Sequence, residues 1–176
     1  MKSTFEIIGG AAKKASADLL LIGGYALQVY GYARQTLDVD CLVVSSDANS
    51  LRELLCLETY APIAETGNFI RFQSDSVYLM DIDILLVDRS TMQAMLAESK
   101  PCRLQGVDFR TPSLLHLIAL KLHAIANNPK RLNRDLADVQ SLLRINADEV
   151  DVEGLVSIVT KFAPEGVAQQ LLEGLG

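Results

Sequence analysis

The stretch Leu37-Asp38-Val39-Asp40-Cys41-Leu42-Val43-Val44 decides the fold, because it alternates as a strand and ends in an apolar run. Alternate side chains of a strand share one face, so Asp38 and Asp40 lie side by side with Cα atoms about 6.5–7 Å apart. Two carboxylates so close repel each other, and aspartate is rare inside strands. The pair therefore indicates either a divalent cation between the carboxylates or a solvated strand edge.

A second stretch, Met80-Asp81-Ile82-Asp83-Ile84-Leu85-Leu86, repeats the same pattern of acids before an apolar run. Two acid-bearing strands in one small sheet are hard to explain by solubility alone. We predict that Asp83 joins Asp38 and Asp40, because it directly precedes the apolar run, with Asp81 as the alternative. Three such carboxylates can hold two ions of Mg²⁺ or Mn²⁺, which prefer carboxylate oxygen and water, for an in-line phosphoryl or nucleotidyl displacement.

A diglycine, Gly23-Gly24, lies between the buried-strand run of residues 19–22 and a helix predicted over residues 25–32. Without Cβ atoms the backbone can approach a ligand closely, and a helix N-terminus offers free N–H groups to a phosphate. A plain strand-to-helix turn is the alternative. Arg34 and Thr36, just before the acid pair, are predicted either as phosphate or metal-shell residues or as turn caps.

The remaining elements define an α+β class: a small mixed sheet with helices over residues 1–110, and a helical subdomain packed on it over residues 111–176. Ser90 is the predicted N-cap of one helix, and Pro112 is predicted in the first turn of another. Beyond Ser90 we expect only helices. In chain order, helices are predicted over residues 4–16, 49–56, 90–97, 112–126, 130–144, 152–162 and 164–175, and a strand hairpin over 69–73 and 77–87.

Positive charge gathers in one part of an acidic chain. The 176 residues carry a formal charge of −6, which argues against a broad nucleic-acid surface. Residues 121–144 nevertheless hold five basic residues and two acidic ones. Lys121 borders an apolar helix stripe, so it either extends along that stripe toward solvent or points at a phosphate. Arg134 and Asp138, four residues apart, can pair along one helix face as an ordinary surface salt bridge.

No targeting or membrane segment is apparent. No apolar run approaches the ~20 residues of a spanning helix, and the first residues lack a signal-peptide core. We therefore expect a cytoplasmic protein without membrane contact. The three cysteines, Cys41, Cys56 and Cys102, are too scattered for a disulfide framework or metal site, and are expected to be small buried residues.

The order of these pieces, from about Asp18 to Arg144, resembles the nucleotidyltransferase fold of the polymerase-beta-like superfamily. The segments 117–124 and 131–138 are similar to the helical part of toxin-like, abortive-infection nucleotidyltransferases. The resemblance implies that Gly23 and Gly24 hold the nucleoside triphosphate, that Asp38 and Asp40 bind metal, and that Asp83 activates the acceptor hydroxyl. Where many relatives have Gly-Ser, this chain has Gly24, so backbone N–H groups must hold the phosphate. Lys121, Arg134 and Asp135 are the further nucleotide-binding residues that we predict. The resemblance also suggests that Asp135 or Asp138 orients Lys121 or Arg134 toward phosphate.

The predicted function is thus a metal-dependent transfer of a nucleoside monophosphate from an NTP to an acceptor hydroxyl of RNA or protein, in a toxin or phage-defence setting. A cognate antitoxin or other partner protein is expected with it. Two alternatives stay open: a small-molecule transferase of the aminoglycoside-modifying type, and a non-catalytic nucleotide-binding or antitoxin-like module of the same fold.

Overall fold

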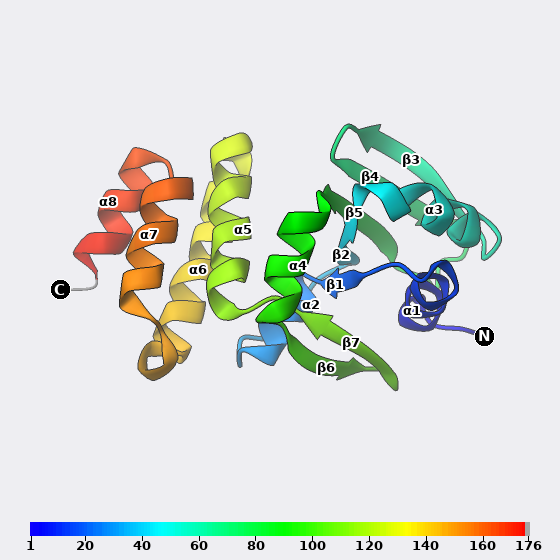
Figure 1. Ribbon diagram of the computed structural model, residues 1–176, viewed down its shortest axis with the longest axis horizontal. Helices are drawn as coiled ribbons and strands as arrows, with labels where there is room; N and C mark the ends of the chain where they lie inside the picture. Colours follow the sequence, from blue (N-terminus) through cyan, green and yellow to red (C-terminus); the bar gives the residue numbers. More distant parts are fainter. Residues whose placement is uncertain (175–176) are drawn as a thin grey trace. The chain divides into compact units, whose positions relative to one another are not determined.

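A five-stranded sheet organises the first part of the chain in the computed structural model, which describes residues 1–174 (Figure 1). The strands lie in the order β1-β2-β5-β4-β3; β2 and β5 run parallel, and the other neighbours run antiparallel. This mixed sheet with its helices confirms the predicted α+β class. Its strands are β1 (Leu19–Leu21), β2 (Asp38–Val44), β3 (Tyr60–Thr66), β4 (Phe69–Ser74) and β5 (Asp81–Val87).

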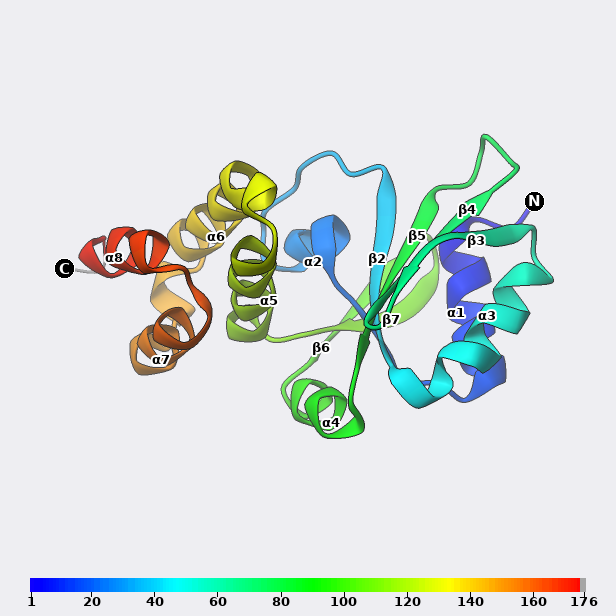
Figure 2. The ribbon, with the colours of Figure 1, turned by 90° about the horizontal axis from the view of Figure 1, so that it is seen from above.

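Helices lie on both sides of this sheet (Figure 2). Helices α1 (Thr4–Ala15) and α3 (Ala48–Cys56) cover one face, and α2 (Gly23–Val29) and α4 (Arg89–Ala97) lie on the other. A capping box at Ser3 starts α1, which continues through its diglycine. The core under α1 and α3 includes Val39, Cys41, Ile82 and Ile84. Because strand side chains alternate, the aspartates of β2 and β5 lie on the opposite face.

A hairpin of β6 (Lys100–Leu104) and β7 (Val107–Thr111) interrupts the helical region, so the expectation of helices alone beyond Ser90 is wrong. Its two-residue turn places Gln105 at φ 48° and Gly106 at φ 83°, the left-handed conformation that such turns require. Phe109 of β7 is buried, with its ring centroid 5.9 Å from that of Phe5. The hairpin is held by this packing, which the local pattern does not show.

The chain forms two compact units. The first comprises residues 1–29 and 33–112, and the second comprises residues 30–32 and the chain from Ser113 onward. The second is helical: α5 (Leu114–Asn127), η2 (Pro129–Arg131), α6 (Leu132–Ile145), η3 (Ala147–Glu149), α7 (Val152–Phe162) and α8 (Glu165–Glu173). Leu175, the predicted end of the last helix, lies outside the described residues. Across residues 1–174, no helix combines the length and apolarity needed to cross a membrane.

Three local predictions need correction. Asp88, not Ser90, is the N-cap of α4, because its carboxylate accepts the Thr91 N–H at 2.9 Å. Pro112 precedes α5 rather than starting it, since Ser113 is the N-cap. Of the cysteines only Cys41 is fully buried, which raises the pKa of its thiol; Cys102 is half-buried and Cys56 is exposed on α3.

Candidate functional site

Three carboxylates converge on the open face of the sheet. One oxygen from each of Asp38, Asp40 and Asp83 can be chosen so that all three lie within 4.8 Å of one another. The parallel register produces this, because Asp40 on β2 is paired with Asp83 on β5, and Asp38 lies two residues earlier on the same face. Opposite ligands of one Mg²⁺ lie about 4.2 Å apart, so small side-chain shifts suffice for a shared ion.

The fourth acid of the two strands lies outside this carboxylate triad. Asp81 is the register partner of Asp38 and shares the same face, but it is not a member of the group that can converge on one ion. The structure thus brings Asp83, the preferred third carboxylate, to Asp38 and Asp40. The side chain of Asp83 is 11% exposed and that of Asp38 is 27% exposed, so Asp38 is more open to solvent than Asp83.

The diglycine touches this site directly. Gly23 adopts φ +65°, and a Cβ atom built on it would lie 1.9 Å from Oδ2 of Asp40. A Cβ atom on Gly24 would lie 2.7 Å from the Cβ of Thr36. Both glycines therefore let the start of α2 pack against the residues that lead into and form the triad. Backbone strain and close contact both exclude larger residues at Gly23.

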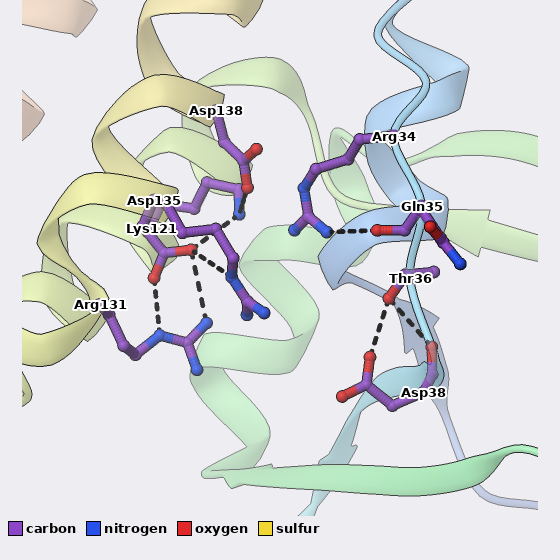
Figure 3. Close-up of polar contacts among 9 residues, drawn as sticks. Arg34, Gln35, Thr36, Asp38, Lys121, Arg131, Asp135 and Asp138 are labelled. Carbon is purple, nitrogen blue, oxygen red and sulfur yellow. Dashed lines mark hydrogen bonds and ion pairs between the residues drawn. The ribbon is translucent and has the colours of Figure 1, made fainter.

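Thr36 orients the first aspartate (Figure 3). Its hydroxyl donates to Oδ1 of Asp38 at 2.8 Å. This contact supports the metal-shell interpretation of Thr36, because hydrogen bonds to a ligating carboxylate fix its orientation. Arg34 donates from Nη1 to the carbonyl oxygen of Gln35 at 3.2 Å. Burial, and then the charge of Asp38, raise the pKa of the nearby Tyr25 hydroxyl.

A cation that the sequence analysis missed sits beside the triad. Arg71 of β4 lies directly opposite Asp83 and donates two hydrogen bonds to its carboxylate, from Nε to Oδ1 at 2.6 Å and from Nη2 to Oδ2 at 2.5 Å. The same Nη2 lies 3.6 Å from Oδ2 of Asp38. The hydrogen bonds and charge of Asp83 raise the pKa of Arg71, despite partial burial. Its position between buried Ile70 and Phe72 was a visible signal, but its pairing depends on the strand order.

The second unit contains a buried charge cluster that joins α5 to α6 (Figure 3). Lys121 is 6% exposed, and its Nζ lies 2.6 Å from Oδ2 of Asp138 and 3.3 Å from Oδ1 of Asp135. Both aspartates are almost fully buried. Lys121 therefore does not extend along the stripe to solvent, and its ammonium group links α5 to two carboxylates of α6. Both of the acids that were predicted to orient Lys121, Asp135 and Asp138, contact its ammonium group.

Arginines complete this cluster at the surface. Arg131 donates from Nε to Oδ2 of Asp135 at 2.6 Å, whereas Nε of Arg134 lies 3.9 Å from Oδ1 of the same carboxylate. Burial raises the pKa of Asp135, but the Arg131 hydrogen bond and the charges of Lys121 and Arg131 outweigh it, so the pKa is lowered overall. Asp135 thus remains an anion within the second unit. Arg131 was not among the predicted site residues.

Comparison with known families identifies the class. A family model described as "Nucleotidyl transferase AbiEii toxin, Type IV TA system" matches residues 10–166. The chain is therefore a nucleotidyltransferase, and the polymerase-beta-like assignment made from Gly23-Gly24 and the acid strands is confirmed. Because the match spans most of its length, the chain belongs to the AbiEii nucleotidyltransferase toxin family. No curated protein is a significant match to the sequence.

Solved structures share the fold at low identity. The solution structure of antibiotic-resistance factor ANT(2'')-Ia superposes with a TM-score of 0.69 at 13% identity, over 98% of this chain and 96% of that one. Lincosamide antibiotic adenylyltransferase LnuA gives 0.54 at 11% identity, over 76% and 90%. A nucleotidyltransferase-like protein from Thermotoga maritima, TM1012, gives 0.52 at 11%, over 74% and 88%. These similarities show a common fold.

Proposed function

We propose that the protein transfers a nucleoside monophosphate from an NTP to an acceptor hydroxyl and releases pyrophosphate. The observation that carries this proposal is the convergence of Asp38, Asp40 and Asp83 within 4.8 Å on one face of the sheet. Membership of the nucleotidyltransferase family supports it independently. Carboxylate oxygens are the ligands that Mg²⁺ and Mn²⁺ prefer, so the triad suits either ion.

The roles follow from position. Asp38 and Asp40 hold the divalent cation together with Asp83, and Thr36 keeps the Asp38 carboxylate oriented. The bound cation supplies positive charge for the triphosphate and the transferred phosphoryl group. Asp83 accepts the proton of the acceptor hydroxyl, whose oxygen then forms a bond to the α-phosphorus while the bond to pyrophosphate breaks. Backbone N–H groups at Gly23 and Gly24, with the side chain of Arg34, bind the phosphates.

The second unit has a less direct part in the proposal. Lys121, Arg134 and Asp135 were predicted to bind nucleotide, and that assignment stays a prediction. The burial of Lys121 between Asp135 and Asp138 favours a structural role for its ammonium group. Arg134, whose side chain is 57% exposed, is the residue of this group most open to a phosphate.

The activity test uses radiolabelled NTPs, Mg²⁺, and pools of RNA, protein and small hydroxylated acceptors. We expect the wild type to transfer label and the Asp38→Ala, Asp40→Ala double variant to transfer none. Asp75→Ala removes an exposed carboxylate from the β4–β5 turn and is the matched control, with wild-type activity. Equal transfer by the wild type and the double variant would reject the proposal, and NTP binding without pyrophosphate release would support a non-catalytic module.

The biological setting that we propose is a cytoplasmic toxin with a cognate antitoxin, acting on RNA or protein. Expression should then arrest growth, and co-expression of the neighbouring gene should relieve the arrest. The double variant should be harmless. Resistance to a hydroxylated antibiotic, without growth arrest, would instead favour the small-molecule transferase.

A further inference from the structure

Arg71 already supplies a positive charge where the proposed cation would bind. Its guanidinium uses both oxygens of Asp83, at 2.6 and 2.5 Å, and lies 3.6 Å from Asp38. A bidentate pair of this kind is among the stronger side-chain contacts, because two parallel N–H groups match the carboxylate plane. Arg71 therefore balances part of the repulsion within the triad.

The same contact conflicts with full cation binding. Asp40, Asp83 and Arg71 form one row across β2, β5 and β4, since Asp40 is paired with Asp83 and Arg71 with Asp83. A divalent cation shared by the triad needs a carboxylate oxygen of Asp83, and each of these oxygens already accepts an N–H of the guanidinium. Two cations of like charge at one carboxylate also repel each other. The guanidinium and a divalent cation therefore compete for the Asp83 carboxylate.

The guanidinium of Arg71 can move away from Asp83 without disturbing the packing of the core. It is 38% exposed, whereas its strand neighbours Ile70 and Phe72 are buried on the opposite face and anchor β4. A change of side-chain torsion can therefore carry the guanidinium toward solvent while the sheet stays in place.

Resting on the proposed metal role of the triad, we propose that Arg71 is a resident counter-cation that holds Asp83 in the metal-free protein and is displaced when a divalent cation binds. Arg71 is a positioning residue: it preserves the triad and weakens its affinity for metal. Cation loading is then coupled to a movement of one arginine side chain.

Direct cation binding tests this competition. Titration of Mn²⁺, followed by electron paramagnetic resonance, should give a Kd about tenfold lower for Arg71→Gln than for the wild type. Arg71→Lys keeps the charge without the planar fork and should lie between them. Arg103→Gln, which breaks an exposed pair with Asp108 at 3.4 Å, is the matched control with an unchanged Kd. An unchanged or higher Kd for Arg71→Gln would overturn the proposal.

A second readout follows the guanidinium itself. In ¹⁵N NMR spectra, the Nε–H of Arg71, assigned by its loss in Arg71→Lys, should be protected from exchange without metal and lose protection at saturating Mg²⁺. Protection that persists at saturation would also overturn the proposal, and this reading does not depend on the folding of Arg71→Gln. A failure of the proposed metal role gives a different result. The wild type would then show no Mn²⁺ binding that the Asp38→Asn, Asp40→Asn double variant abolishes.

Discussion

Gly23 lies so close to Asp40 that a Cβ atom on Gly23 would come within 1.9 Å of Oδ2 of that carboxylate. The two residues are well separated in the sequence, but the turn from β1 to α2 places Gly23 in contact with the Asp40 carboxylate. A positive φ of 65° adds a second reason for glycine, because L-residues pay about 1–2 kcal/mol in this conformation.

Gly23→Ala should therefore impair both stability and cation binding. We expect the free energy of unfolding to fall by at least about 1 kcal/mol, and Mn²⁺ affinity to drop because Asp40 is pushed aside. Urea denaturation and Mn²⁺ titration measure the two effects. Gly10→Ala is the control: nothing lies within 4 Å of its added Cβ, so the same change in α1 should stabilise the protein by about 1 kcal/mol.

Thr36→Val should weaken cation binding without unfolding the protein. The change removes the 2.8 Å hydrogen bond to Asp38 and keeps the side-chain shape. Loss of such an orienting contact typically costs about 10–100-fold in metal affinity. Thr66→Val, at the exposed β3–β4 turn, removes a hydroxyl that bonds only locally to Asn68 and should leave the affinity unchanged. Equal Kd values for the two variants would contradict the orienting role of Thr36.

Asp83→Asn should reduce label transfer more than Asp81→Asn does. Asp83 belongs to the triad and takes the acceptor proton in the proposed reaction, and loss of a general base typically costs at least about 100-fold in rate. Asp81 shares the face but stands outside the convergent group. Initial rates of label transfer at saturating Mg²⁺ measure the difference. A larger loss of rate in Asp81→Asn would assign the role of third carboxylate and general base to Asp81 instead of Asp83.

Lys121→Met should destabilise the second unit by about 3–5 kcal/mol, because it leaves Asp135 and Asp138 buried beside an apolar group. Chemical denaturation measures the loss. Lys130→Met removes an exposed lysine from η2 and should change stability little. If Lys121→Met were as stable as Lys130→Met while nucleotide affinity fell, the phosphate-binding role first predicted for Lys121 would be correct.

Acid should destabilise the protein in part through Asp135. Its pKa is lowered in the folded state, so it adds stability that is fully present above the unfolded pKa of about 3.9 and is lost as the pH falls through the folded value. Between pH 5 and strongly acidic pH, the free energy of unfolding should therefore fall less steeply in Asp135→Asn than in the wild type. Urea titrations across this range check the slope, and parallel curves would contradict it.

The acid strands and the diglycine were readable from local sequence, because strand alternation and the absence of a Cβ are properties of a few adjacent residues. From them the class of protein and the candidate triad follow. β3 was missed, since nearly all of its residues are exposed and Pro62 breaks the pattern, as is common in an edge strand. The β6–β7 hairpin was missed because its packing partner on α1, Phe5 against Phe109, lies about a hundred residues away in the sequence.

Only the tertiary structure decided which charges meet. The parallel register of β2 and β5 places both Asp81 and Asp83 beside the aspartates of β2, and only the placement of the side chains makes Asp83 the member of the triad. The order of the sheet brings Arg71 to Asp83. Likewise, the packing of α5 on α6 buries Lys121 with two aspartates. The sequence alone showed only that Lys121 borders an apolar stripe, a position that is equally compatible with binding a phosphate. Sequence periodicity determines the face on which a residue lies, but its partners depend on which strands and helices become neighbours.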